Sequence, residues 1–523
     1  MRDELLLVLK KVLKEISVDL NPLIERPKDP NFGDYTTNVV LQSRISPRET
    51  LDLLNKLNEN KPKSVEKIEL KGSFINFWLT KTYLQNQVLE IEKLGVKYGS
   101  SNKFSGKAAK VEFISANPTG PLHIGNARGG PLGDVLANVL EKVGYKVTRQ
   151  YLHNNVGGQV KQLGQTIYYT IFPDKKGEEE LFYKGEYVQK LADKIKPQIK
   201  ENMDFEEVGS IAVEILLLEI MEDVKAMGIK FDEVKKESDL RREVPTLIEN
   251  LQKKGVVKEK EGALWFAPSD EFLKDRETVV RKSDGEFTYF ASDIVYHRDK
   301  FEDGTDLVVD VLGAGHFGHI PRLKAAINSL GFDVNKFKII IYELVRIQRG
   351  GLVVKMSKRQ GDFVTAREVL DIVGKDAFRY FLLTTGPSTH MDFDVELASK
   401  KANENPVFYV QYAYSRISSI LRQACDFGNP SVELLKENEE IELIRQLTKF
   451  PELVEEVSRS FSVHFLTAYA YQLATLFHKF YESHKVLSDN QDLTAARVAL
   501  LMSTKTVLKN TLDLLGVEAP EKM

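Results

Sequence analysis

Residues 111–143 constrain the fold more than any other part of this sequence. They combine a strand-like run at 111–115 (VEFIS), turn residues at 117–121 (NPTGP) and the apolar spacing of a helix from 134 to 143. A strand that leads through a tight loop into a helix is the repeating unit of a parallel sheet. Because strand and helix patterns alternate from 110 to about 375, we expect a doubly wound parallel sheet there.

The patterns on either side of this sheet predict two further domains. The first part of the chain opens with an amphipathic helix and continues into strand-like runs, which predicts a small α/β module, and the last part has helical spacing nearly throughout. A helical stretch rich in Lys and Glu predicts an insertion in the central domain. We therefore expect a multidomain α/β protein with a module at 1–105, a doubly wound central domain at 106–375 with an insertion at about 174–227, and an all-α bundle at 376–523.

The composition is that of a globular protein. The 523 residues are 28% charged and 42% hydrophobic, which allows several cores and gives no sign of disorder. The single cysteine, Cys425, excludes an intramolecular disulfide and a zinc site built from several cysteines, and we expect no structural metal. Without a long apolar run or a signal segment, we expect a soluble, cytoplasmic protein with no membrane contact. The net charge of −3 neither indicates nor excludes a nucleic-acid partner.

Residues 123–126 (HIGN) lie where the loop after the first strand meets a predicted helix N-terminus. Backbone N–H groups at such a terminus attract phosphate. His123 can hydrogen-bond a triphosphate, and Gly125 leaves room for a nucleotide to approach the backbone. By itself, a histidine beside glycines is more often an ordinary turn residue.

Residues 355–358 (KMSK) form a second motif, 355 − 126 = 229 residues after the first one ends. Gly350, Gly351 and Gly361 flank it, which predicts a tight turn and a loop able to close over a ligand. Lys355 and Lys358 can stabilise negative charge on phosphates, and the motif also offers a serine hydroxyl. Two lysines on a glycine-flanked loop favour a phosphate site over the ordinary-turn interpretation of the first motif.

In this order, the two motifs resemble those of class I aminoacyl-tRNA synthetases, which activate an amino acid with ATP and load it onto tRNA. Further segments resemble the arginyl-tRNA synthetase family: 32–35 (FGDY), 72–77 (GSFINF), 115–118 (SANP), 376–379 (DAFR) and 515–523 (LGVEAPEKM). Cysteinyl enzymes share the bundle type, but they lack the N-terminal module and need cysteine zinc ligands. The resemblance implies that the substrates are arginine, ATP with Mg²⁺ and the tRNA specific for arginine, and we expect a monomer.

The resemblance also implies roles for individual residues. The catalytic residues would be His123, Gly125, Asn126, Lys355, Ser357 and Lys358. Those that bind ATP would be His123, Gly125, His316, Met356 and Lys358, and those that bind arginine would be Ser115, Asn117, Glu237, Tyr289 and Asp293.

The charge of the expected substrate supports part of this arginine site. A buried guanidinium requires carboxylates, because an unpaired buried charge costs several kcal/mol. Tyr289 and Asp293 are four residues apart and share a face if their segment is helical. Without the motifs, an ordinary helix and a solvated Glu237 would be the better interpretation.

Both ends of the chain carry residues expected to contact tRNA. By resemblance, Phe74, Asn76 and Phe77 would grip the outer corner of tRNA, and a helix with Tyr409 and Arg416 would face the anticodon. RNA loops are read by stacking and by hydrogen bonds to base edges. The alternatives are a strand with Phe77 in the core and a helix whose tyrosines are buried.

The sequence departs from the family pattern at three positions and leaves two other functions open. Asn126 stands where the first motif usually ends in histidine, and Gly315 and Phe317 stand where an acid and a second histidine are common. The other functions are a synthetase of glutamyl or lysyl type and a non-catalytic RNA-binding paralogue. ATP–pyrophosphate exchange with each amino acid distinguishes them.

Overall fold

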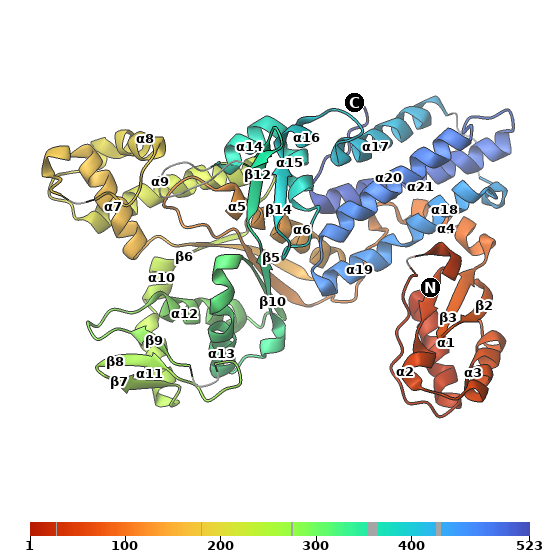
Figure 1. Cartoon of the computed structure of the whole chain (residues 1–523), viewed down its shortest axis with the longest axis horizontal. Helices are drawn as coiled ribbons and strands as arrows, with labels where there is room; N and C mark the ends of the chain where they lie inside the picture. Colours follow the sequence, from red (N-terminus) through yellow and green to blue (C-terminus); the bar gives the residue numbers. More distant parts are fainter. Residues whose placement is uncertain (28, 179, 274–275, 354–363, 425–429) are drawn as a thin grey trace.

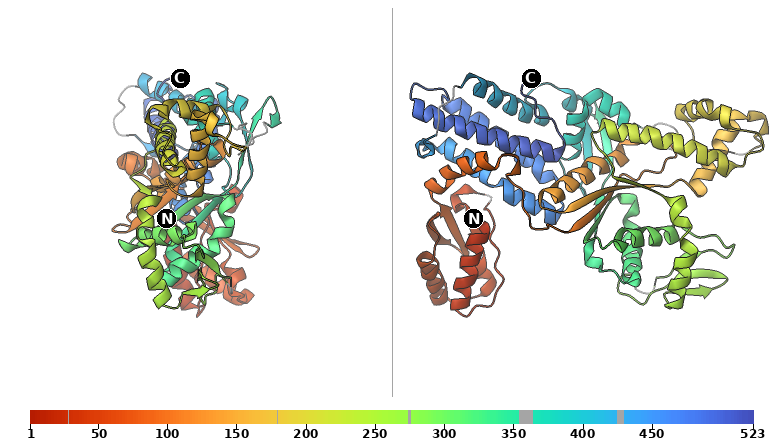
Figure 2. Two further views of the ribbon diagram at one scale, coloured as in Figure 1. Left: turned by 90° about the vertical axis from the view of Figure 1, so that its left-hand side faces the viewer. Right: turned by 180° about the vertical axis from the view of Figure 1, so that it is seen from behind.

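A computed structural model describes residues 1–523 except 28, 179, 274–275, 354–363 and 425–429. The chain forms an elongated molecule with a parallel sheet near its centre (Figure 1). A helical insertion lies at one end of the long axis, and a helix bundle with an N-terminal module lies at the other, as the view from behind also shows (Figure 2). No described helix is long and apolar enough to cross a membrane.

The central sheet has the strand order β11-β10-β4-β5-β6, and every pair in it is parallel. The chain runs from β4 outward to β6 and then returns to β10 on the other side of β4. This reversal makes the carboxyl ends of β4 and β10 the topological switch point, where open α/β sheets bind ligands. The strands and helices of this unit are β4 (Ala108–Phe113), α5 (Ile124–Ala127), α6 (Gly129–Lys142), β5 (Lys146–His153), β6 (Glu233–Lys236), β10 (Leu307–Gly313), α13 (Ile320–Leu330) and β11 (Phe337–Tyr342).

Glycines let α6 lie directly on this sheet. A Cβ at Gly133 would stand 2.2 Å from the ring of Phe113, and one at Gly129 would stand 2.9 Å from the ring of Tyr342. Any larger residue would push the helix away from β4. The predicted doubly wound sheet and its first helix are therefore confirmed.

The insertion is a group of three helices between β5 and β6. Helices α7 and α9 pack so closely that a Cβ at Gly164 would meet the carbonyl of Phe205 at 1.8 Å. The group begins at Gly158, whereas the prediction starts the insertion at about 174. Its helices are α7 (Gly158–Ile171), α8 (Glu186–Ile195) and α9 (Phe205–Ala226).

A smaller antiparallel sheet and its helices follow between β6 and β10. The sheet has the order β7-β8-β9. The elements are α10 (Glu237–Arg241), α11 (Val244–Lys253), β7 (Val257–Lys260), β8 (Ala263–Phe266), β9 (Thr278–Arg281) and α12 (Tyr289–Glu302).

A third sheet, β13-β12-β14, follows β11 in the chain. The strands of this sheet and the helices near them in the chain are β12 (Val345–Arg349), β13 (Leu352–Val353), α14 (Ala366–Val373), α15 (Lys375–Leu382), β14 (Met391–Asp394) and α16 (Val395–Ser399).

The N-terminal module is an antiparallel sheet of order β1-β3-β2 with helices packed against it. It touches the bundle through charged groups: Arg26 Nε lies 2.7 Å from Glu452 Oε2, and Arg445 Nε lies 2.9 Å from Asp34 Oδ1. The last helix, α4, packs on bundle helices α18 and α21. The elements are α1 (Arg2–Glu15), β1 (Tyr35–Thr37), α2 (Val39–Ser43), α3 (Pro47–Glu59), β2 (Val65–Lys71), β3 (Phe74–Leu79) and α4 (Lys81–Leu94).

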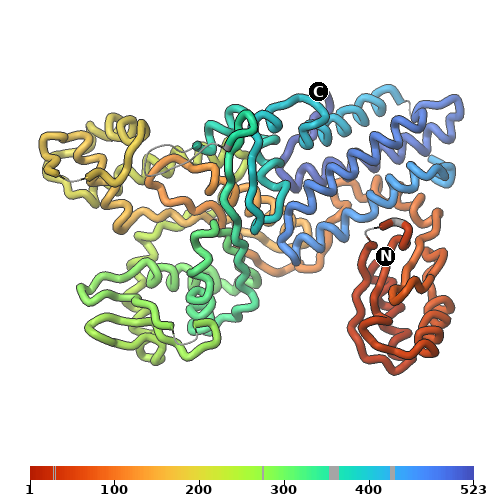
Figure 3. The backbone as a smooth tube through the Cα atoms, in the orientation of Figure 1, coloured from red at the N-terminus to blue at the C-terminus, as the bar shows by residue number. Residues whose placement is uncertain are grey.

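The C-terminal part is the predicted all-α bundle, and its long helices run side by side along the molecule (Figure 3). They are α17 (Pro406–Gln423), α18 (Asn438–Thr448), α19 (Phe450–Ser460), α20 (His464–Ser483) and α21 (Gln491–Leu515).

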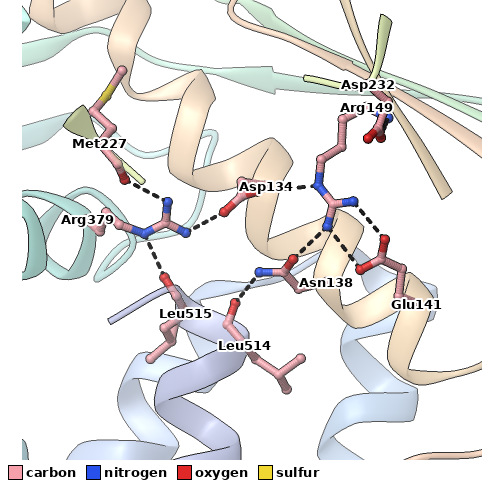
Figure 4. A network of polar contacts seen from close by, with 9 residues as sticks. All are labelled: Asp134, Asn138, Glu141, Arg149, Met227, Asp232, Arg379, Leu514 and Leu515. Atoms are coloured by element: carbon pink, nitrogen blue, oxygen red, sulfur yellow. Dashed lines mark hydrogen bonds and ion pairs between the residues drawn. The ribbon is translucent and has the colours of Figure 1, made fainter. Parts of the chain in front are cut away.

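A buried ion pair joins the bundle to the central sheet. Arg379 on α15 is fully buried, and its Nη2 lies 2.6 Å from Asp134 Oδ2 on α6. It also donates to the carbonyls of Leu515 (2.9 Å) and Met227 (3.0 Å). Asp134 lies between this arginine and a second one, Arg149, as Figure 4 shows. The arginine of the 376–379 tetrad therefore holds three parts of the chain together.

Candidate active site and tRNA contacts

The structure brings the flanks of the two sequence motifs together. Ile124 N–H donates to the carbonyl of Val364 (3.3 Å), and Ala366 N–H donates to that of Leu122 (2.8 Å). His123 and Thr365 form an antiparallel bridge between these bonds. Lys355, Met356, Ser357 and Lys358 lie outside the described residues. Val364, the first described residue after them, is thus held beside the first motif, although it lies 364 − 126 = 238 residues after the end of that motif in the sequence.

A tight hairpin precedes the second motif, as predicted. Arg349 pairs with Leu352 across Gly350 and Gly351, whose φ angles are 58° and 73°. Two positive φ angles in a two-residue loop favour glycine strongly. The N–H of Gly350 also donates to the carboxylate of Glu396, which anchors the turn.

His123 caps the helix that begins at the first motif. Its Nδ1 accepts the N–H of Gly125 at 2.8 Å. Because Nδ1 is the acceptor, the ring proton of the neutral imidazole must be on Nε2, which makes Nε2 a donor. A Cβ at residue 125 would stand 3.0 Å from Nδ1. The structure therefore gives Gly125 a role in this cap, in addition to the predicted nucleotide approach.

Asn126 and His316 lie on either side of the switch point. Asn126 is half-buried in α5, where its carbonyl accepts the hydroxyl of Tyr342 at 3.3 Å. His316 is exposed in the 3-10 turn after β10, with its ring 5.7 Å from that of His319. Phe317, which departs from the family pattern, is also exposed there.

The end of β4 has an unusual backbone. Ile114 and Ser115 have φ angles of 66° and 36°, a region that residues with side chains seldom adopt. The Ser115 hydroxyl holds this turn, because it donates to Glu112 (2.7 Å) and accepts the N–H of Leu152 (3.0 Å). Asn117 follows on the surface and hydrogen-bonds Gln159 and Asn154. Both predicted arginine-binding residues of this segment therefore lie at the mouth of the switch point.

Glu237 is a buried carboxylate at the start of α10, with only 3% of its surface exposed. Its Oε1 accepts from Arg241 at 3.1 Å, whereas its Oε2 is buried without a hydrogen-bond partner among the described residues. Burial raises the pKa of Glu237, and Arg241 together with the Ser292 hydroxyl lowers it again in part. The predicted solvated alternative for Glu237 is therefore wrong.

Tyr289 and Asp293 are four residues apart on helix α12, so the condition under which they were expected to share a face is met. Asp293 is half-buried, and its carboxylate makes no hydrogen bond or ion pair with the described residues. Burial raises the pKa of Asp293 to about 6; His297 and Arg322 oppose this rise, and the nearby Glu237 and Glu112 contribute to it. This half of the site therefore contains carboxylate oxygens without hydrogen-bond donors, and a bound cation would stabilise their charged form.

A buried charge network lies beneath this site, and the sequence analysis missed it. Lys300 is fully buried, pairs with Glu112 and lies 2.6 Å from Asp310 Oδ1. Asp310 Oδ2 lies 2.9 Å from Nε2 of His297, whose Nδ1 lies 2.7 Å from the carbonyl of Asp293. With the bond from Ser115 to Glu112, the network ties the strand end to the α12 turn. Its signal in the sequence is that residues 293, 297 and 300 recur at helical spacing on a buried face.

The outer face of the N-terminal sheet carries part of the predicted tRNA site. Phe74 is 45% exposed, and lysines cover the ring of Trp78, with Lys67 Nζ 4.9 Å from its centroid. Asn76 is only 1% exposed, yet neither Oδ1 nor Nδ2 has a hydrogen-bond partner in the described part of the chain. Phe77 is also 1% exposed and lies in the core, so its predicted stacking on a base is not possible in this conformation.

Tyr409 and Arg416 lie half-buried on α17, where the helix faces α20. The ring of Tyr409 is 4.8 Å from that of His478, and the guanidinium carbon of Arg416 is 4.5 Å above the ring of Tyr481. Tyr412, between Tyr409 and Arg416, is half-buried, whereas Tyr414 is buried. The helix therefore presents a partly exposed stripe of rings that includes Arg416.

Comparisons with known proteins agree with this architecture along the chain. A model of the arginyl tRNA synthetase N terminal domain matches residues 3–79. A model of the class I tRNA synthetase (R) catalytic domain matches 87–214 and 214–381, and a DALR anticodon binding domain model matches 410–523.

Individual relatives match over nearly the whole chain. The arginine–tRNA ligase of Caldanaerobacter subterraneus subsp. tengcongensis is 39% identical over 525 residues, covering 96% of this chain and 93% of its own length. That of Bacillus subtilis is 37% identical over 539 residues, covering 99% and 97%. The solved arginyl-tRNA synthetase of Thermus thermophilus has the same fold, with a TM-score of 0.82 at 22% identity and 100% coverage of both chains.

Proposed function

The chain belongs to the arginyl-tRNA synthetase family, and from this membership we propose specific roles for the residues at the switch point. As an arginine–tRNA ligase of class I, it activates arginine with ATP to arginyl-adenylate. It then transfers the arginyl group to the 3′-terminal adenosine of its tRNA, releasing AMP and pyrophosphate.

The arginine side chain binds between Glu237 and Asp293. The observation that carries this proposal is the excess of carboxylate oxygens: among the described residues, Oε2 of Glu237 has no hydrogen-bond partner and the Asp293 carboxylate makes no ion pair. Two partly buried carboxylates that interact with each other suit one planar guanidinium, which donates five hydrogen bonds. Tyr289 on the same helix would close the pocket, and Ser115 and Asn117 would orient the α-amino end.

The triphosphate of ATP, bound as its Mg²⁺ complex, lies over the first motif. The Nε2–H of His123 and the helix N-terminus beyond it supply donors, and Asn126 adds an amide. His316 would contact the nucleotide from the β10 side. Lys355 and Lys358 would approach from the loop whose far end is bonded to Ile124, with Met356 and Ser357 between them. The charge that develops on the phosphates would then meet two ammonium groups.

The tRNA contacts lie at the two ends of the chain. The amide of Asn76 is 1% exposed and has no hydrogen-bond partner among the described residues, so base reading requires its neighbours to move when tRNA binds. A base edge would then supply the missing hydrogen bonds. Phe74 would stack on a neighbouring base, whereas Phe77 supports the strand from inside. Tyr409 and Arg416 would face the anticodon loop. We further propose that the enzyme acts as a monomer in the cytoplasm, where charged tRNA is consumed.

Pyrophosphate exchange and aminoacylation test these roles together. Purified protein should exchange pyrophosphate with arginine and with no other amino acid, and it should charge tRNA specific for arginine. We expect Asp293→Asn to abolish most exchange with arginine while the protein still binds ATP. Unchanged arginine kinetics in that variant would refute the proposed pocket, and light scattering of the pure protein would test the monomer.

A further inference from the structure

An arginine of the chain itself lies in the pocket proposed for substrate arginine. Arg241 is four residues after Glu237 on α10, and its Nε and Nη2 both lie 3.1 Å from Oε1 of that carboxylate. Its guanidinium carbon is 5.8 Å above the ring of Tyr289. The Arg241 side chain is 35% exposed, whereas that of Glu237 is 4% exposed.

Gly157 shows how closely these groups are packed. A Cβ at this residue would stand 2.6 Å from the hydroxyl of Tyr289 and 2.9 Å from Nη2 of Arg241. Its φ angle of 101° also excludes most side chains. The guanidinium of Arg241 and the phenol of Tyr289 therefore share one small space beside the first helix of the insertion.

The charges of the pocket explain what this arrangement achieves. Glu237 and Asp293 contribute two negative charges when ionised, and Arg241 contributes one positive charge. The balance is one negative charge, which a single substrate guanidinium neutralises. Without Arg241, two partly buried carboxylates would face each other, and like charges disfavour ionisation of both.

The other groups around the two carboxylates do not replace Arg241. Asp293 interacts with His297, Arg322, Glu112 and Glu237, but His297 is hydrogen-bonded to Asp310. Glu237 interacts with Arg241 and with the neutral hydroxyl of Ser292. Arg241 is thus the cation paired with Glu237 among the described residues.

We propose that Arg241 is a specificity-determining positioning residue. It fixes and neutralises Oε1 of Glu237, so that Oε2 and the Asp293 carboxylate remain to bind the guanidinium of the substrate. The inference rests on the arginine pocket proposed above. In this proposal, the ion pair between Arg241 and Glu237 on α10 contributes to recognition of the amino acid.

The test compares Arg241→Met, which removes the charge but keeps much of the length, with Arg241→Lys, which keeps the charge. Arg242→Met is the matched control, because this neighbouring arginine has an 80% exposed side chain and pairs only loosely with Asp239, at 3.6 Å. Arginine-dependent pyrophosphate exchange is measured with tRNA present, from about pH 5.5 to about pH 8.5. Melting temperatures are recorded for each protein, and Arg241→Gln serves as a second neutral variant if the Met variant does not fold.

We expect Arg241→Met to raise the KM for arginine about tenfold near pH 6 and to move the pH midpoint of kcat/KM upward by about one unit, with kcat nearly unchanged. Arg241→Lys should recover most of this loss, and Arg242→Met should match the parent. An unchanged midpoint and KM in Arg241→Met, or a fall in kcat alone, would overturn the proposal.

Asp293→Asn separates this proposal from the pocket itself. If Asp293→Asn raises the arginine KM and Arg241→Met does not, only the role of Arg241 is wrong. If neither variant changes the arginine KM, the pocket lies elsewhere and the proposed function of both carboxylates is wrong.

Discussion

Asn76→Leu should make the protein more stable and a poorer enzyme for tRNA. The side chain is 1% exposed, and neither polar atom of its amide has a hydrogen-bond partner in the part of the chain that the structure describes. Leucine has the same number and branching of heavy side-chain atoms, so the substitution removes the orphaned groups without opening a cavity. A buried unsatisfied polar group costs about 1–3 kcal/mol. We therefore expect the free energy of unfolding to rise by at least about 1 kcal/mol.

The same substitution removes the amide proposed to read a base. Loss of such a contact typically costs about 1–3 kcal/mol, which corresponds to roughly 5- to 150-fold in kcat/KM for tRNA. The KM for ATP should not change, because Asn76 lies on β3 and far along the chain from the sheet that carries the ATP motifs. Denaturant unfolding and aminoacylation with varied tRNA concentration measure the two effects on one preparation.

Thr37→Val is the matched control on the same sheet. Thr37 is also buried, and its hydroxyl has no hydrogen-bond partner among the described residues. It pairs with Ile75 of β3, so its side chain points to the face opposite Asn76. Valine has nearly the same shape, so this variant should gain stability without losing tRNA charging. If Asn76→Leu melts at a lower temperature and loses charging in proportion, Asn76 serves the fold and the base-reading proposal is wrong.

Four further substitutions test the remaining proposals. Lys355→Ala and Lys358→Ala should slow arginine activation about 10²-fold with little change in the arginine KM, since their charge is needed mainly in the transition state; a raised KM at full turnover would contradict this. Asp293→Asn should cost about 2–5 kcal/mol in kcat/KM for arginine and much less for neutral citrulline. Because burial raises the pKa of Asp293 to about 6, kcat/KM of the parent enzyme should fall as the pH drops through 6, while the guanidinium stays charged. Arg379→Met should cost about 3–5 kcal/mol in stability by leaving Asp134 without its closest partner, and an unchanged unfolding curve would refute the role given to that pair.

The sequence predicted those parts of the fold that depend on local signals. The strand before the first motif, the helix after it and the hairpin at Gly350 and Gly351 each follow from spacing and turn chemistry within a few residues. The same holds for α12, where the four-residue spacing of Tyr289 and Asp293 became a shared helix face. Such features need no knowledge of distant contacts.

The parts that the sequence did not predict depend on pairs far apart in the chain. Glu112 and Lys300 are 188 residues apart, and nothing local to either one shows that they share a buried site. Asn76 has a polar side chain in a strand whose burial does not alternate, since residues 75, 76 and 77 are all buried, and nothing local to Asn76 indicates that both faces of the strand are covered there. Which face of a strand is buried depends on the elements that pack against it. The aromatic ring of Phe77 therefore did not by itself show that this residue is exposed and able to stack on a base.

The buried contacts of Arg379 connect the C-terminal bundle to the helix that follows the His123 cap. Helix α6 follows α5 directly, so the helical run that starts at the His123 cap contains Asp134 in its middle. Asp134 is bonded to Arg379, and Arg379 is bonded to the last turn of α21. Because these groups are buried and close-packed, a displacement of the bundle cannot occur without breaking this pair or moving α6. The bundle that is expected to hold the anticodon is therefore mechanically continuous with the helix whose start carries the ATP-side histidine.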